Sequence, residues 1–239
     1  MGLFELLRRK PTGNRFQRTF RIHGVKVRIG DIPTSIAPTI AHELKIDTYG
    51  LQRIPFKPGD VVVDIGGHIG LPAIYLAMRY PQIHVHAFEP CPPNYRSFVE
   101  NIARNGVTNV TVDNLAITAD RRDLQMIINL ENSGGATGNL ADMRLPGHEY
   151  FTVPSITLDD AFGRYNIARC KLLKIDCEGS EHEILRSTSV LDRVEWLSGE
   201  FHINRRLEAE GHSIDGLVRY LTQSIPRERI CYEPCRMAE

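Results

Sequence analysis

The chain has 239 residues, of which 42% are hydrophobic and 24% charged, and its formal net charge is zero. These values are typical of one soluble globular α/β domain with room for a short extension. No run of about 18 apolar residues is present, and no apolar segment follows the N-terminus, so we expect neither a membrane span nor a signal peptide.

The N-terminal part is strongly basic, because residues 1–30 carry eight Lys or Arg side chains against the single acidic Glu5. We therefore predict a basic extension over residues 1–44 and a catalytic domain over residues 45–239. With the apolar residues near Leu3, the extension could contact an anionic membrane surface or an acidic partner. The plainer interpretation is a solvated, partly mobile N-terminus. The rest of the chain is net acidic and lacks a basic-aromatic stripe, so a nucleic-acid partner is not expected.

The most informative segment begins with three valines from Val61, which predict a buried strand. The strand ends at an acid, and glycines then turn the chain into a helix over about residues 69–80. The glycine spacing does not match a dinucleotide fingerprint, and the acid lies where a pyrophosphate would. An acidic corner suits the ammonium and sulfonium of S-adenosylmethionine (SAM). The predicted SAM-binding residues here are Asp64, Gly66, Gly67, His68 and Gly70.

A second strand is predicted over residues 84–88, followed by a helix over 94–105 and a third strand over 110–116. Glu89 ends the second strand, where a carboxylate can accept hydrogen bonds from both ribose hydroxyls of an adenosine. Its plainer interpretation is a solvated strand end. The adenine is expected against the end of the third strand, at Asn114, Leu115 and Ala116.

The remaining elements alternate. Two extra strands, over 124–130 and 150–156, flank a Gly-rich stretch over 132–139, which is either a lid or a surface turn. The other predicted strands cover 172–176, 194–199 and 228–232, and helices cover 158–162, a segment from about 180, and 216–223. This alternation predicts a doubly wound, mostly parallel sheet with helices on both faces.

Acidic residues follow the fourth and fifth main strands. Asp176 and Glu178 are expected to border the ligand crevice, where their repulsion needs a compensating cation such as Lys174, the sulfonium or a divalent metal. Glu181 is interpreted instead as an acid in a first helical turn, favoured by the helix dipole.

Glu200 and His202 are two residues apart, so an extended segment points both side chains to one side. Four residues are candidates for catalysis: Asp176, Glu178, Glu200 and His202. His202 is either a base at neutral pH or a structural histidine bonded to a backbone carbonyl. Asp176 and Glu200 are the candidate ligands of a divalent metal such as Mg²⁺, which is considered but not expected. The five cysteines are odd in number and form no CxxC, which indicates reduced thiols of a cytoplasmic protein and no zinc site.

The segments VVVDIGGHIG, HAFEP, SITLDD, KIDCEGSE and EFH, in this order over residues 45–205, resemble the FkbM family of SAM-dependent methyltransferases. The resemblance implies that Asp64, Gly66, Gly70 and Glu89 hold SAM and that Asp176 and Glu178 lie at the reaction end. This chain departs from the family by carrying His68 where Asn is frequent. It also stops soon after Tyr232, so the antiparallel strand pair that usually closes such a sheet is expected to be incomplete or completed by a partner subunit.

The resemblance further implies an O-methyltransferase that acts on a hydroxyl of a sugar, glycoconjugate or other small natural product. Two alternatives stay open. The first is a methyltransferase that acts on RNA or protein. The second is a catalytically silent SAM-binding module whose basic arm docks to a partner. A homo-oligomer is also left open.

Overall fold

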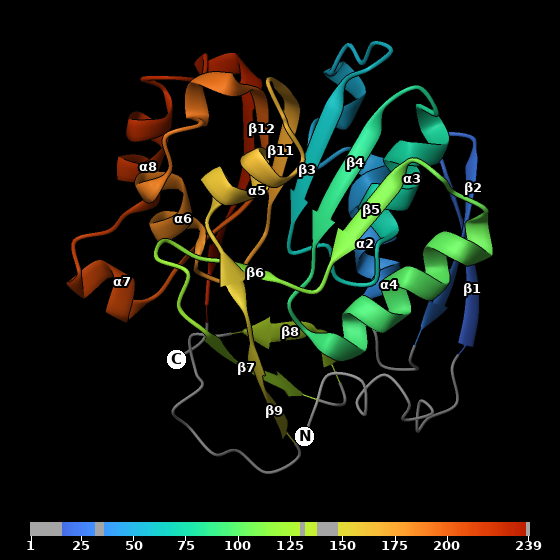
Figure 1. The fold of residues 1–239 in the computed structure, drawn as a ribbon, viewed down its shortest axis with the longest axis horizontal. Coiled ribbons are helices and arrows are strands. Elements are labelled where there is room, and N and C mark those ends of the chain that lie inside the picture. The colour runs from blue at the N-terminus through green and yellow to red at the C-terminus, as the bar shows by residue number, and fades with distance from the viewer. Residues whose placement is uncertain (1–15, 32–35, 130–131, 138–147, 238–239) are drawn as a thin grey trace.

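A computed structural model of the chain describes residues 16–31, 36–129, 132–137 and 148–237 (Figure 1). Its centre is a six-stranded sheet with the order β13–β12–β11–β3–β4–β5, in which all neighbouring strands are parallel. In that order the strands span Ile230–Arg236, Val194–Ile203, Cys170–Ile175, Val61–Ile65, His84–Phe88 and Val110–Asp113. The predicted doubly wound α/β fold is confirmed.

Alternate side chains of the central strands enter two separate cores, because successive residues of a strand point to opposite faces. Val62 and Leu172 belong to one core, Val63 and Leu173 to the other, and all four are fully buried. The helices of the first core are α2 (Ala37–Ile46), α3 (Leu71–Arg79) and α4 (Pro92–Asn105). Those of the second core are α5 (Leu158–Arg164), α6 (Glu181–Ser187) and α8 (Ile214–Leu221). The sheet is thus covered on both faces (Figure 1).

The basic N-terminal segment contains an antiparallel hairpin of β1 (Phe16–Ile22) and β2 (Val25–Asp31), where only a basic extension was predicted. The two turn residues His23 and Gly24 both have positive φ angles, of 43° and 85°, as a tight hairpin turn requires. Strand β2 packs on α3 and α4, and its Ile29 is fully buried. Residues 16–31 therefore share the first core with the helices. The predicted arm before residue 16 lies outside the described residues.

A smaller sheet of three antiparallel strands has the order β8–β7–β9. Its strands span Asn132–Thr137 (β8), Leu124–Asn129 (β7) and His148–Val153 (β9). Part of the predicted Gly-rich stretch thus forms β8, and the rest of it lies outside the described residues. Figure 1 shows this sheet on the side toward which the arrowheads of β3, β4 and β5 point. That side carries the carboxyl ends of the central strands.

The short elements complete the described chain. A parallel pair joins β6 (Ala116–Ile117) to β10 (Ser155–Ile156). The single-turn segments are η1 (Leu51–Arg53), η2 (Leu191–Arg193), η3 (Arg227–Arg229) and the short helix α7 (Arg205–Ala209). No antiparallel strand joins the central sheet within the part that the structure describes, so β13 is its edge. None of the helices in that part has both the length and the apolar character needed to cross a bilayer.

Candidate active site

The site lies where the order of the central strands reverses. The chain builds β3, β4 and β5 outward in one direction and then returns to place β11 on the other side of β3. Ligands of open α/β sheets bind at the carboxyl ends of the strands beside such a reversal. A cavity of about 240 Å³ occupies this position. Its walls carry Gly66, Gly67, His68, Glu89, Leu115, Ala116, Asp176, Glu178 and Glu200, nine of the residues predicted from the sequence.

The glycine turn after β3 is required by its close approach to β11. Gly66 has φ +79°, and a Cβ atom there would lie 1.8 Å from the backbone oxygen of Asp176. Gly70, with φ +89°, precedes α3, and a Cβ atom there would lie 2.1 Å from the ring of Phe98. No larger side chain fits either position. Gly70 packs against Phe98 and does not line the cavity.

Glu89 holds the glycine turn against the end of β4. The carboxylate is 4% exposed and accepts hydrogen bonds from the backbone N–H groups of His68, at 2.7 Å, and Cys91, at 2.9 Å. Burial raises the pKa of Glu89 to about 8, although these hydrogen bonds lower it. The carboxylate thus lies in the cavity wall with its backbone partners fixed, and it can still accept from a hydroxyl of a ligand.

Asp64 does not line the cavity, because its carboxylate turns to the neighbouring strand. Lys174 is its register partner on β11, and Lys174 Nζ lies 3.1 Å from Asp64 Oδ1, with both side chains at most 3% exposed. Burial lowers the pKa of Lys174, but Asp64 and Asp176 raise it above its ordinary value. Neither oxygen of Asp64 makes a well-formed hydrogen bond within the described residues. A direct contact of Asp64 with a cofactor stays a prediction.

Of the three residues predicted to contact adenine, two line the cavity and one does not. Leu115 and Ala116 line the cavity, and Leu115 also packs on the second core. The side chain of Asn114 instead donates hydrogen bonds to the backbone oxygens of Glu89 and Pro90, both at 2.8 Å. Asn114 therefore ties the ends of β4 and β5 together and does not face the cavity.

Carboxylates gather at the other end of the cavity. Burial raises the pKa of Asp176 above its ordinary range, and burial with repulsion from Asp176 raises the pKa values of Glu178 and Glu200 to about 7 each. The charge of His202 lowers the pKa of all three carboxyl groups and so opposes these shifts. So many acids in one buried place either keep protons or need a cation. Glu178 also has a φ of 52°, in the left-handed region that is uncommon for residues other than glycine.

His202 lies beside this acidic end without lining the cavity. Its Nδ1 lies 3.1 Å from Glu181 Oε1, and its Nε2 lies 3.8 Å from Glu178 Oε2 and 3.7 Å from Glu200 Oε2. Burial lowers the pKa of His202, but Glu181, Glu178 and Asp176 raise it to about 9. A protonated imidazole cannot accept a proton, so a base at neutral pH in this protein without a ligand is one of the carboxylates.

Glu181 has a larger role than the helix-dipole interpretation assigned to it. The side chain is fully buried and accepts hydrogen bonds from the backbone N–H groups of Cys177, at 2.7 Å, and Gly179, at 3.1 Å, besides its bond to His202. It therefore shapes the turn that carries Glu178 and also orients the histidine. The helical position was predicted, but the contact with His202 depends on packing that the local sequence does not report.

One wall of the cavity was missed entirely. It comes from α2 and the turn after it, with Ile36, Thr39, Ile40, Glu43 and Tyr49. The hydroxyl of Tyr49 lies 3.1 Å from Glu43 Oε2 and 3.3 Å from Glu200 Oε1, to either of which it can donate. Burial and the surrounding carboxylates raise the pKa of Tyr49 far above its ordinary value, so it remains a neutral donor. The helical spacing of Ile40 and Leu44 was the available signal for α2.

Comparisons with known proteins show which family this sequence matches. A family model described as the Methyltransferase FkbM domain matches residues 64–223. The 31-O-demethyl-FK506 methyltransferase FkbM of Streptomyces tacrolimicus is 29% identical over 199 residues, which cover 70% of this chain and 71% of that protein. Methyltransferase 1 of Beauveria bassiana (strain ARSEF 2860) is 28% identical over 159 residues, with 59% of this chain and 62% of that protein covered.

Among solved structures, the precorrin-6y C5,15-methyltransferase from Geobacter metallireducens GS-15 matches with a TM-score of 0.43 at 12% identity. The match covers 75% of this chain and 70% of that one.

Proposed function

The chain belongs to the FkbM methyltransferase family, and we propose that it transfers a methyl group from SAM to a hydroxyl of a sugar, glycoconjugate or other small natural product. The observation that carries this proposal is one cavity lined by two chemically different groups of residues. Glu89 is hydrogen-bonded to the glycine turn, and we assign these residues to one end; Glu178 and Glu200 both face His202, and we assign them with Asp176 to the other. The first end suits a nucleoside, and the second suits a hydroxyl that must lose its proton.

The residues of the first end fit SAM. Glu89 presents carboxyl oxygens to which ribose hydroxyls can donate, and its own hydrogen bonds to the turn hold it in place. The walls at Leu115 and Ala116 are apolar, as an adenine ring requires. The acids further along the cavity suit a cationic ligand by charge. When bound, SAM supplies an electrophilic methyl group on a sulfonium, whose sulfur departs as a neutral thioether.

The residues of the second end have two tasks. They hold the acceptor oxygen in line with the methyl group, since positioning supplies much of the rate of such a displacement. They also receive the proton that the hydroxyl loses as the new oxygen–carbon bond forms. Asp176 and Glu178 are the proposed proton acceptors because both line the cavity, and the backbone of Asp176 lies against Gly66 of the glycine turn. Tyr49 is a neutral donor that orients Glu200 or the acceptor.

Isothermal titration calorimetry tests the cofactor. We expect micromolar binding of SAM and of S-adenosylhomocysteine, weakened at least tenfold in Glu89→Gln. The matched control is Glu100→Gln, which makes the same change at an exposed position of α4 and should bind as the wild type. Absence of SAM binding, or tight NAD binding in its place, would overturn this part of the proposal.

Turnover with labelled SAM and a fractionated extract tests the acceptor. Label in small or saccharide material supports the proposed class. Label found in RNA or protein alone would favour the first alternative, and SAM binding with no transfer to any fraction would favour a silent module. The paired acids argue against a silent module, because holding these charges together costs free energy that a binding module has no need to spend.

The role of Asp176 has its own test. Asp176→Asn keeps the shape of the side chain and removes its charge, so kcat should fall by about 10² while SAM affinity changes little. Asp192→Asn, at an exposed position, is the control. If Asp176→Asn weakens SAM binding strongly while kcat at saturating SAM stays normal, the assignment of the two ends is wrong.

A further inference from the structure

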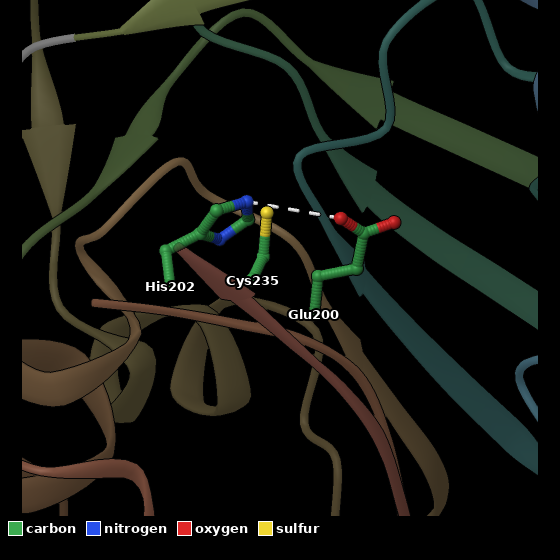
Figure 2. Close-up of side chains that lie close together, drawn as sticks. All are labelled: Glu200, His202 and Cys235. Carbon is green, nitrogen blue, oxygen red and sulfur yellow. Dashed lines mark ion pairs between the residues drawn. The ribbon is translucent and has the colours of Figure 1, made fainter. Parts of the chain in front are cut away.

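We propose that Glu200, His202 and Cys235 form a zinc site at the acidic end of the cavity. The placement follows from strand geometry. Glu200 and His202 are two residues apart on β12 and therefore share a face of the sheet. Cys235 is the register partner of His202 on the parallel strand β13, which brings its side chain next to the imidazole. Figure 2 shows the three side chains pointing toward one another.

The spacing of the three groups suits a metal ion. One ligand atom of each residue lies within 4.8 Å of the other two, and His202 Nε2 lies 3.7 Å from Glu200 Oε2. Zinc bonds of about 2.0–2.3 Å in a tetrahedral site place neighbouring ligand atoms roughly 3.4 Å apart. Small side-chain movements would therefore bring the three ligand atoms to the spacing that zinc requires. The 3.7 Å separation is also too long for a hydrogen bond between the two side chains.

The imidazole of His202 is the observation that points to a ligand. Its side chain is 3% exposed, and its Nε2 faces Glu178 Oε2 at 3.8 Å and Glu200 Oε2 at 3.7 Å, beyond hydrogen-bond distance from either carboxylate. Its Nδ1 is bonded to the fully buried Glu181. Histidines that bind metals usually donate their other ring N–H to a carboxylate, which fixes the tautomer and aims the free lone pair at the metal. His202 has this arrangement at Nδ1, and an ion that binds Nε2 displaces the proton which that nitrogen carries in the protein without a ligand.

Glu181 is held rigidly enough for this supporting role. It accepts hydrogen bonds from the backbone N–H groups of Cys177 and Gly179, so its oxygens are already committed and it orients the histidine without binding the ion itself. Asp176 and Glu178 line the same part of the cavity, and Glu178 Oε2 lies 3.8 Å from His202 Nε2. A dication would offset the repulsion among these acids.

The donor set selects zinc over magnesium. A thiolate and an imidazole suit zinc, whereas magnesium prefers oxygen ligands alone. Three protein ligands also leave a fourth position open, as in catalytic zinc sites. Of the three ligands Glu200 lines the cavity, so an open position on the side of Glu200 would face the cavity. Resting on the proposed function, the ion would hold the acceptor hydroxyl there and lower its pKa.

This inference departs from the expectation that the cysteines are plain thiols without a zinc site. That expectation rested on their spacing along the chain, where no CxxC occurs. Strand register, which the spacing does not report, creates the pair of His202 and Cys235.

Cobalt(II) is a coloured probe for the proposed site. The full-length protein, treated with a chelator and transferred to metal-free buffer, is titrated with Co²⁺ and then with Zn²⁺. We expect one Co²⁺ per chain, with the near-ultraviolet absorption of a sulfur–cobalt bond, and its displacement by Zn²⁺. Cys235→Ser should remove this absorption and weaken Zn²⁺ binding at least tenfold. Glu181→Gln should weaken it about 10–100-fold, the usual effect of losing a supporting carboxylate.

The matched control is Cys231→Ser, on the same strand, whose sulfur donates to the backbone oxygen of Thr48 at 3.4 Å. It should keep both the absorption and the affinity. Failure of the wild type to bind Co²⁺, binding without sulfur absorption, or full absorption in Cys235→Ser would each overturn the proposal. The measurement needs neither SAM nor an acceptor, so its failure is distinct from failure of the proposed methyl transfer.

Discussion

The buried ion pair of Lys174 and Asp64 allows a test of how much the compensation of Asp64 contributes to the stability of the fold. Lys174→Met keeps most of the length of the side chain and removes its charge. The carboxylate of Asp64 is 2% exposed, and apart from its ion pair with Lys174 no hydrogen bond to it is found within the described residues, so the variant leaves a buried charge uncompensated. Leaving one member of a buried ion pair in this state typically costs about 3–5 kcal/mol.

That cost is a large part of the total stability of a domain, which is about 5–15 kcal/mol. For a chain of this size, 1 kcal/mol lowers Tm by about 2–4 °C, so the expected loss is about 6–20 °C. Urea and thermal denaturation of the protein without ligand, at pH 7, measure it. The double variant with Asp64→Asn removes the stranded charge and should recover at least about 2 kcal/mol.

Lys171→Met is the matched control on the same strand. Lys171 Nζ lies 2.9 Å from Glu195 Oε1, but Glu195 is 27% exposed, so water can solvate the carboxylate that remains. The expected loss is about 1 kcal/mol or less. The reasoning is refuted if Lys174→Met costs no more than this control, or if the double variant is as unstable as the single one.

Three further predictions concern the cavity and the first core. Gly66→Ala would place a Cβ atom 1.8 Å from the backbone oxygen of Asp176 at φ +79°, so calorimetry should find SAM binding weakened more than tenfold; wild-type affinity would contradict the need for glycine. Ile29→Ala, at a fully buried position of β2, should lower the free energy of unfolding by about 2–5 kcal/mol. Phe16→Ala, at a 46% exposed position, should change it by less than about 0.5 kcal/mol, and equal effects would show that the hairpin is not part of the core. The pKa of Glu89 is about 8 in the folded protein against an ordinary 4.5, so between these values the folded state keeps a proton that the unfolded chain has lost. Stability should therefore fall as pH rises from about 4.5 to 8, and Glu89→Gln should flatten this fall in denaturation curves; a slope equal to that of the wild type would contradict the shift.

Much of the central fold was predictable because its signals are local. The valines of β3 and the apolar run of β11 identify buried strands, and the glycines after Ile65 identify a turn that only they can adopt. Such signals depend on residues within a few positions of one another. The hairpin of β1 and β2 escaped because its alternating basic residues resemble a solvated extension, although the inward-facing Ile22, Val27 and Ile29 are buried.

The candidate site, like the fold, has features that were predictable from the sequence and features that were not. The sequence by itself identified the acids and the glycine turn, because each ends a predicted strand and parallel strands bring such ends to one edge of the sheet. Only the tertiary structure decided which way each side chain turns. Asp64 faces Lys174 and not the cavity, Tyr49 reaches Glu200 from an earlier part of the chain, and Cys235 joins His202. These contacts depend on the register between strands and on helix packing, which arise from interactions among residues far apart in the chain.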